Sequence, residues 1–229
     1  MSFNLEEAQV CAVLSSMVYD TKQGQSPSWD QLNRILREKA DRYPPISHIL
    51  KNLQVRQDES SFDMACFSSP NTIYIAVRGT DFADNVRDWL NNWEIAVFDL
   101  AVTRSARCVS IALNWKNHHK GKRVVCAGHS LGGTVAIALS RFGVGDFTHV
   151  FNYGRGLPNV TDRVFAAIFE INPDHALHHH IFGDLISPRY TAKVRTITYK
   201  QNCKSGNPAT AHSLDNFTDA VARGGWPHV

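Results

Sequence analysis

The residues with the clearest chemical potential form the run Gly128–Gly132 (Gly-His-Ser-Leu-Gly), near the middle of the 229-residue chain. A buried-strand pattern, Arg123–Ala127, precedes this run, and a small-residue helix pattern, Thr134–Leu139, follows it. So tight a reversal between strand and helix forces its central residue into a strained conformation and pushes the serine hydroxyl out of the sheet. The first amides of the helix then point at the same place. The spacing therefore predicts that Ser130 is a nucleophile on a strand–turn–helix elbow.

A serine nucleophile needs two partners. Its hydroxyl is poorly reactive near neutral pH unless a neighbouring base, itself oriented by a carboxylate, takes the proton. In folds with such an elbow the partners follow along the chain, first Asp or Glu and then His, each after a later strand. Asp184 directly follows the strand pattern His178–Phe182, and His212 lies between the last strand pattern and the last helix pattern. We therefore predict Asp184 as the orienting carboxylate and His212 as the base.

Other residues compete for these two roles. Asp162 begins a predicted helix, where N-terminal capping explains it, and Asp174 precedes its strand. The rivals of His212 are four histidines earlier in the chain, of which the last three alternate across a strand: His175, His178, His179 and His180. A metal site is disfavoured there, because no Cys or carboxylate at ligand spacing accompanies the histidines. His129 is too close along the chain to act on its neighbour.

Acyl transfer also requires two donors aimed at the oxyanion that develops on the substrate carbonyl. Leu131, directly after the nucleophile, supplies one backbone amide. The second donor should come from a loop after an earlier strand, and the strand pattern Thr72–Arg78 runs into Gly79 and Thr80. Gly79 permits a sharp turn there. We predict that the amides of Thr80 and Leu131 form the oxyanion hole, with the Thr80 hydroxyl as an additional donor.

The elements that must position these groups follow from the hydrophobic pattern. Strand-like apolar runs cover residues 62–67, 72–78, 123–127, 148–153, 178–182 and 194–199. Helical patterns cover residues 4–19, 28–40, 83–93, 101–119, 131–142, 161–169 and 213–222. Short apolar strands alternating with helices predict an α/β fold, with a mostly parallel sheet covered by helices on both faces. The first two strands instead predict an antiparallel hairpin that feeds this sheet.

The composition is that of an ordinary globular protein: 43% of the residues are hydrophobic, 20% are charged, and the net charge is +3. The length suits one α/β domain over residues 1–229. No run of Lys and Arg is long enough to predict nucleic-acid binding. No apolar run approaches the ~20 residues that a membrane span needs. Composition leaves the oligomeric state open.

The expected compartment follows from the cysteines and the N-terminus. The five cysteines are scattered and lack Cys-x-x-Cys spacing, which favours a reducing compartment over a disulfide scaffold or a zinc site. Residues 1–19 carry two glutamates before their apolar stretch and lack a basic start, so they do not have the pattern of a signal peptide. We expect a cytoplasmic protein, or one exported by a route without an N-terminal signal peptide.

Taken together, the motifs resemble the class 3 lipases, the fungal-lipase-like branch of the α/β-hydrolases. They occur in family order over residues 72–220: Ile75–Thr80, Asp88–Leu90, Gly128–Gly133, Gly183–Pro188 and His212–Phe217. The resemblance implies the α/β-hydrolase fold, and it implies the same Ser-Asp-His set and the same two oxyanion amides that the spacing selects. It further implies hydrolysis of carboxylic esters of lipids without a metal or an organic cofactor.

The sequence departs from the family pattern in three places. Asn92 stands where the family commonly has an aspartate that helps to hold the oxyanion residue. The family's Gly-x-Pro after the corresponding strand is lengthened to Gly154–Pro158, and the interval from Asp184 to His212 is short. We therefore expect trimmed loops around the acyl pocket. These departures bear on the substrate and the level of activity more than on the type of reaction.

The segment after the oxyanion strand has the pattern of an amphipathic helix. Its apolar stripe, with spacing i, i+4, i+7, i+8 and i+11, consists of Phe82, Val86, Trp89, Leu90 and Trp93. The resemblance implies a lid that turns this stripe towards lipid, with transient contact to a membrane or lipid interface. A helix packed permanently on the core would have the same pattern, and the sequence favours neither interpretation.

These observations predict two-step hydrolysis of a lipid ester through an acyl-enzyme on Ser130. Acylglycerols and phospholipids fit equally, because both present an acyl ester and differ mainly in the leaving group. Two alternatives stay open. One is an esterase or thioesterase without interfacial behaviour. The other is a catalytically silent α/β-hydrolase that serves as a binding module, which Asn92 keeps under consideration.

Overall fold

The computed structural model of the chain describes residues 4–20, 29–56, 60–61, 63–79, 104–153, 175–184, 194–200 and 208–229. Its centre is a seven-stranded sheet in which the strands lie side by side in chain order. The strands are β1 (Gln54–Val55), β2 (Met64–Ser68), β3 (Thr72–Val77), β4 (Arg123–His129), β5 (Phe147–Phe151), β6 (Ala176–Ile181) and β7 (Arg195–Tyr199). Six of them match the predicted strand patterns to within a few residues.

The direction of the strands determines at which edge of the sheet functional side chains can come together. β2 and β3 form the predicted antiparallel hairpin, and every neighbouring pair from β3 to β7 is parallel. In the register of the sheet, Val77 lies beside Gly128, and Phe151 lies beside both His129 and His179. The carboxyl ends of the parallel strands therefore meet at one edge, which is where sites form in sheets of this type.

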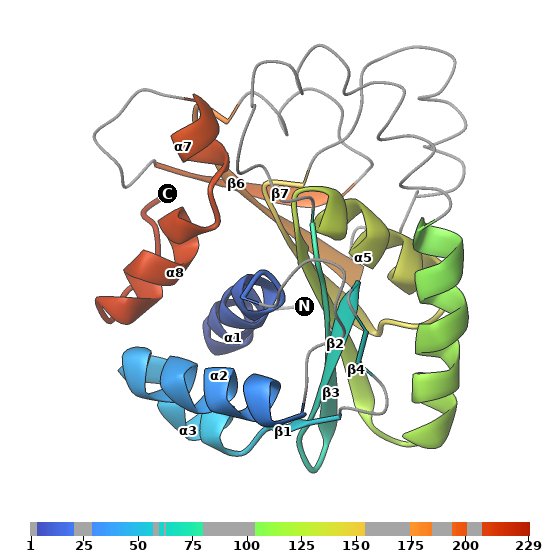
Figure 1. Cartoon of the computed structure of the whole chain (residues 1–229). Coiled ribbons are helices and arrows are strands. Elements are labelled where there is room, and N and C mark those ends of the chain that lie inside the picture. The colour runs from blue at the N-terminus through green and yellow to red at the C-terminus, as the bar shows by residue number, and fades with distance from the viewer. Residues whose placement is uncertain are drawn as a thin grey trace, which may run out of the picture.

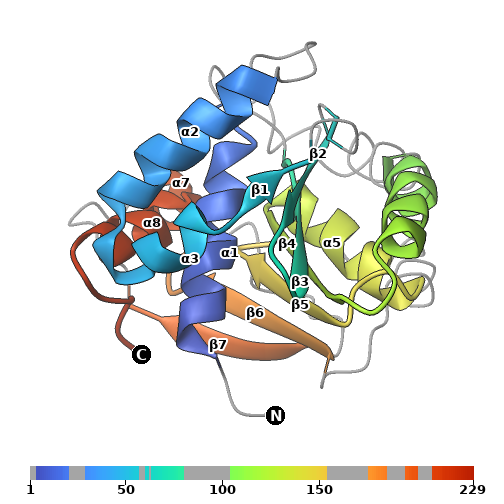
Figure 2. The same cartoon turned by 90° about the horizontal axis from the view of Figure 1, so that it is seen from below.

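Helices cover both faces of the sheet, as predicted (Figure 1 and Figure 2). On one face lie α1 (Leu5–Met17), α2 (Trp29–Arg42), the 3₁₀ helix Pro44–Ile46, α3 (Ser47–Lys51) and α8 (Asp215–Ala222). On the other face lie α5 (Leu131–Arg141) and the helix over residues 104–118. None of the described helices is long and apolar enough to cross a membrane.

Two hydrophobic cores result, one on each face of the sheet. Alternate residues of β4 point into opposite cores: Val125 and Ala127 pack beneath α1, whereas Val124 and Cys126 pack beneath α5. Because β4 is covered on both sides, its sequence is a continuous apolar run and does not alternate between apolar and polar. The four cysteines that the structure describes are buried thiols within these cores: Cys11, Cys66, Cys108 and Cys126.

α1 crosses the middle of its face and is buried on almost every side. Its first turn is capped by Asn4, whose side chain accepts a hydrogen bond from the amide of Glu7 over 3.1 Å. Glu7 is itself buried and is held by Arg123 of β4 and by His149 of β5, whose Nε2 lies 3.1 Å from Glu7 Oε1. A polar chain thus ties the start of α1 to two strands of the sheet.

The structure also differs from the sequence-based expectations. The last predicted helix, residues 213–222, corresponds to α8, which begins at Asp215, and a short helix that was not predicted, α7 (Pro208–His212), precedes it. β1, α3 and the 3₁₀ helix were not predicted, since elements this short carry no periodic signal. The predicted helices 83–93 and 161–169 lie outside the described residues.

Candidate active site

Ser130 occupies a sharp turn between β4 and α5. Its backbone angles, φ 55° and ψ −129°, lie in a region that residues with a side chain rarely adopt. Two backbone hydrogen bonds hold this conformation: the Ser130 amide donates to the Phe151 carbonyl over 3.2 Å, and the Gly133 amide donates to the Ser130 carbonyl over 3.0 Å. The predicted elbow is present, and it is strained.

The glycines on either side of Ser130 are required by close backbone contacts. A Cβ atom on Gly128 would lie 2.3 Å from the carbonyl oxygen of Gly132. A Cβ atom on Gly132 would lie 2.4 Å from the carbonyl oxygen of Val77. Both obstacles are backbone atoms of packed elements, so a side chain at either position has no room. The two glycines of the Gly-x-Ser-x-Gly pattern are therefore needed for β3, β4 and α5 to pack closely against one another.

Asp184 and His212 meet beside this elbow. Asp184 follows β6 after a turn at Gly183 (φ 92°), and His212 ends α7. The distance between His212 Nδ1 and Asp184 Oδ2 is 3.0 Å, and both side chains are at least 95% buried. A carboxylate oxygen accepts, so Nδ1 donates to Asp184, which leaves Nε2 as the ring nitrogen that can exchange a proton with the nucleophile. The two residues predicted from spacing are thus brought into contact, 28 positions apart in sequence.

The carbonyl oxygen of His212 is held by two buried side chains. His129 Nε2 lies 2.7 Å from it, and Asn152 Nδ2 lies 3.2 Å from it. Asn152 also donates to the carbonyl of Ala211 over 3.0 Å, and its Oδ1 accepts from the amide of Ile181 over 2.9 Å. Because Ile181 ends the strand before Asp184, one side chain links the segments that carry both members of the pair.

A second amide fixes the same turn from α8. Asn216 Nδ2 lies 2.7 Å from the carbonyl of Thr210 and 3.1 Å from that of Ser213, and Asn216 is buried. Buried carbonyl groups without partners cost free energy, so these bonds stabilise the one conformation that satisfies them. Neither Asn152 nor Asn216 was predicted from the sequence as a site residue. The signal for Asn152 is its position directly after β5, at the edge where the parallel strands end.

His129 also helps to position His212, a role that its place next to Ser130 in the sequence does not indicate. Its ring centroid lies 4.9 Å from that of His212. Burial, followed by the nearby His212, lowers the pKa of His129 to about 3, so the ring is neutral. Nε2–H donates to the His212 carbonyl, and Nδ1 therefore accepts from the hydroxyl of Tyr19 at 3.2 Å. The alternation of Val125, Ala127 and His129 along β4 was the signal that placed this ring beneath α1.

Two of the rival histidines, His178 and His179, have other partners. His179 Nε2 lies 3.0 Å from His149 Nδ1, and His179 Nδ1 lies 3.0 Å from the hydroxyl of Tyr199. His178 packs on the opposite face against Tyr153, and burial lowers its pKa to about 3. In the part of the chain that is described, no three His, Cys, Asp or Glu side chains are grouped to hold a metal ion.

The predicted oxyanion residues are described in part. Leu131 is buried and is the first residue of α5, where helix geometry leaves an amide without an acceptor inside the helix. Thr80 lies outside the described residues, as do Asn92 and the whole predicted lid stripe from Phe82 to Trp93. Gly79 is described, and a Cβ atom there would lie 2.6 Å from the carbonyl oxygen of His129. The end of β3 therefore contacts the elbow directly.

Comparisons with known proteins agree with this architecture. A phospholipase-like family model, described as a Tle-like phospholipase domain, matches residues 10–219. A propeptide complex of a deletion mutant of Rhizomucor miehei lipase is 12% identical with a TM-score of 0.54, over 93% of this chain and 77% of that one. That likeness shows the α/β-hydrolase fold. No curated protein sequence matches the chain.

Two further solved structures are similar over much of their length. A triacylglycerol lipase from Penicillium expansum is 15% identical with a TM-score of 0.47, over 97% of this chain and 89% of that one. A mono- and diacylglycerol lipase from Aspergillus oryzae is 14% identical with a TM-score of 0.48, over 90% and 83%.

Proposed function

Because the chain belongs to the family of Tle-like phospholipase domains, we propose that it hydrolyses acyl esters of phospholipids with Ser130 as its nucleophile. The observation that carries the proposal is the hydrogen bond of 3.0 Å between Asp184 and His212 beside the strained serine turn. A neutral imidazole oriented by a buried carboxylate is the base that a serine nucleophile requires.

The reaction proceeds in two steps. Ser130 Oγ attacks the ester carbonyl while His212 Nε2 takes its proton, and Asp184 stabilises the imidazolium that forms. The amides of Leu131 and Thr80 donate to the oxyanion of the tetrahedral intermediate. His212 then returns the proton to the leaving alcohol. In the second step His212 takes a proton from water as the water attacks the acyl-enzyme carbonyl. His212 then returns this proton to Ser130 Oγ as the bond between the acyl carbon and Oγ breaks, which releases the fatty acid and restores the serine.

The strain at Ser130 supports an enzyme over a silent binding module. A backbone conformation of this kind costs about 1–3 kcal/mol and persists where the surroundings enforce it, commonly at functional sites. Ser130 Oγ is buried and has no hydrogen-bond partner among the described residues. A buried hydroxyl without a partner costs free energy of folding, and a purely structural turn gains nothing in return. In a hydrolase the same hydroxyl is the nucleophile that the base activates.

Labelling with a fluorophosphonate probe tests the proposal, because such probes react with activated serines. Wild-type protein should label and should release fatty acid from phosphatidylcholine micelles, and Ser130→Ala should do neither. Ser110→Ala is the matched control, since Ser110 is exposed on the helix over residues 104–118. Equal labelling of wild type and Ser130→Ala, or unchanged fatty-acid release by Ser130→Ala, contradicts the assignment of the nucleophile.

A further inference from the structure

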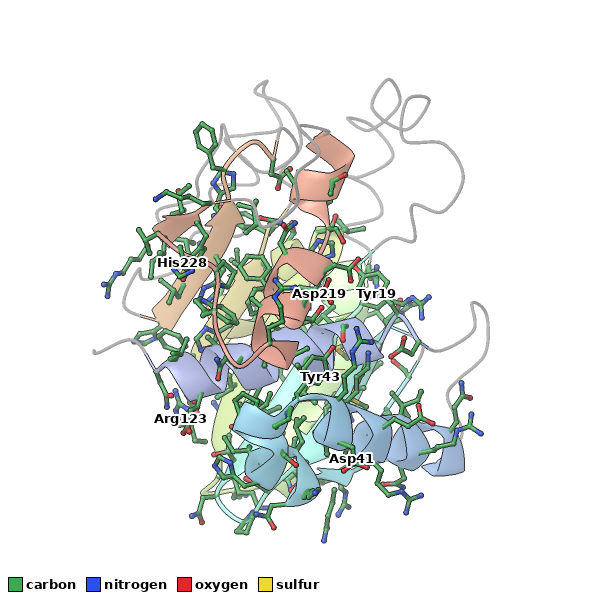
Figure 3. All side chains as sticks on the ribbon, turned by 90° about the vertical axis from the view of Figure 1, so that its left-hand side faces the viewer. Tyr19, Asp41, Tyr43, Arg123, Asp219 and His228 are labelled. Carbon is green, nitrogen blue, oxygen red and sulfur yellow. The ribbon has the colours of Figure 1, made fainter. Side chains whose placement is uncertain are left out.

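A cavity of about 510 Å³ adjoins the candidate site on its α1 side. It lies among the end of α1, the second half of α2 and the start of α8, and its lining includes both His129 and His212. Figure 3 shows this side of the molecule, with Tyr19 and Tyr43, two aromatic members of the lining, between α8 and α2. Its volume falls within the range of about 300–1,000 Å³ that is typical of small-molecule sites.

Two cations of α2 line the cavity, and each pairs with a carboxylate, although the Arg42 side chain is 60% exposed. Lys39 Nζ lies 3.0 Å from Asp20 Oδ2, and its side chain is 14% exposed. Arg42 Nη2 lies 3.5 Å from Asp219 Oδ1. An ammonium has three N–H donors and a guanidinium has five, more than these contacts use. Both cations can therefore bind an anionic group in the cavity while keeping their carboxylate partners, and Arg is suited to bidentate contact with a phosphate.

Apart from the two histidines, the rest of the polar lining carries negative charges or hydroxyl groups. Asp20 and Asp215 contribute carboxylates, and Ser16, Ser213 and Thr218 contribute hydroxyls. Asp215 is fixed at the start of α8, where its Oδ2 accepts from Ser213 Oγ over 3.0 Å. The lining itself holds two cations and two carboxylates, and Asp219, outside the lining, pairs with Arg42. Such a site complements a ligand that carries both a negative and a positive group.

We infer that this cavity binds the zwitterionic phosphodiester headgroup of the substrate, with Lys39 and Arg42 at the phosphate and Asp215 at the ammonium group. The inference rests on the proposed function and deepens it. During hydrolysis His212 hands its proton to the leaving oxygen, so the group attached to that oxygen must lie beside His212. In a glycerophospholipid, glycerol carbons alone separate the ester oxygen from the phosphodiester, so a headgroup attached to the leaving oxygen can extend past His212 towards the cavity that His212 borders.

A neutral leaving group does not use this lining. The free hydroxyl of a diacylglycerol offers no charge to Lys39, Arg42 or Asp215, and filling the cavity with it would desolvate these groups without compensation. The charged lining thus favours phospholipid over acylglycerol as substrate. The acyl ester, which both lipids share, does not distinguish them.

The test compares three substrates with identical acyl chains in nonionic mixed micelles: phosphatidylcholine, phosphatidic acid and diacylglycerol. Arg42→Gln should raise KM for phosphatidylcholine roughly tenfold, the effect of losing a charge-assisted hydrogen bond. Its kcat/KM on diacylglycerol should stay within about twofold of wild type, because no binding interaction with that substrate is lost. Arg34→Gln is the matched control, since Arg34 is exposed on the same helix and pairs with Glu38.

A second variant tests the ammonium end of the site. Asp215→Asn should raise KM for phosphatidylcholine and leave KM for phosphatidic acid unchanged, because phosphatidic acid has no ammonium group. Equal losses on all three substrates in Arg42→Gln, or equal effects of Arg42→Gln and Arg34→Gln on phosphatidylcholine, overturn the inference. If Ser130→Ala still releases fatty acid, the proposed function fails instead, whatever the cavity variants do.

Discussion

The side-chain amide of Asn152 donates to the backbone carbonyl oxygen of His212 over 3.2 Å, at the end of β5 and beside the serine turn. Asn152 has a positive φ of 42° and is fully buried. Asparagine tolerates this conformation better than most residues, and its side chain can donate and accept at once. Asn152 therefore acts on the position of the base through the His212 backbone.

Replacing Asn152 by aspartate should lower kcat on phospholipid roughly 10–100-fold with little change in KM. The substitution keeps the shape and the tolerance of positive φ, but it removes both donors and places a carboxylate against the carbonyls of Ala211 and His212. A misplaced base costs chemistry more than binding. Steady-state kinetics checks this, with Asn114→Asp, at an exposed position of the helix over residues 104–118, as control. A rise in KM at constant kcat would show that Asn152 does not position the base.

His129→Gln should keep more activity than His129→Leu, although leucine is the more apolar replacement for a buried ring. Glutamine retains an N–H donor for the His212 carbonyl, whereas leucine leaves that bond unmade. Because the pKa of His129 is lowered to about 3, neither variant should move the acidic limb of the kcat/KM profile near neutral pH. A pH–rate profile of both variants provides the check. Equal activity of the two would mean that the donor at position 129 is dispensable.

Gly132→Ala should lower the free energy of unfolding by about 1–3 kcal/mol, the usual effect of forcing extra atoms into packed structure. The added Cβ would lie 2.4 Å from the Val77 carbonyl oxygen, so β3 and α5 must separate. Urea denaturation measures the loss. Gly225→Ala serves as control, because its Cβ would lie 3.8 Å from the nearest atom, an ordinary contact. Similar destabilisation of both variants would contradict the packing argument.

Acidification should destabilise the fold through its buried neutral histidines. Burial, the largest cause, lowers the pKa of His129 and that of His178 from 6.5 to about 3. The unfolded chain therefore binds more protons than the folded one between these values. The free energy of unfolding is therefore highest above pH 6.5. It falls as the pH drops from 6.5 towards 3, by up to about 1.4 kcal/mol per pH unit for each histidine.

Urea denaturation at several pH values between 7 and 4 measures this slope. His178→Gln should reduce the slope, because one buried group that protonates on unfolding is removed. His48→Gln, at an exposed position of α3, is the matched control. An unfolding free energy independent of pH over this interval would contradict the burial of neutral histidines.

Much of the fold followed from local sequence pattern. The apolar runs predicted six of the seven strands, and the glycines around Ser130 predicted the turn between β4 and α5. Both signals are local: a strand covered on both faces needs a continuous apolar run, and a strained turn needs glycine beside it. The chain order of serine, aspartate and histidine then selected Asp184 and His212, which the structure brings into contact. The roles of Thr80 and of the stripe from Phe82 to Trp93, the single-domain organisation and the cellular compartment stay predictions.

The tertiary structure decided what holds the site together. Asn152 and His129 reach the His212 carbonyl across 60 and 83 positions of sequence, and no periodicity records a contact between segments so far apart. The cavity beside His212 likewise combines side chains from α1, α2 and α8, each of which looks like an ordinary exposed polar residue in its own helix. The hydrophobic pattern of an element reflects which of its faces is buried. Hydrogen bonds and cavities between distant segments depend instead on how the elements pack against one another. The sequence thus determined the sheet and the serine turn, and the packing of three helices on one face decided how the base is held and what lies beside it.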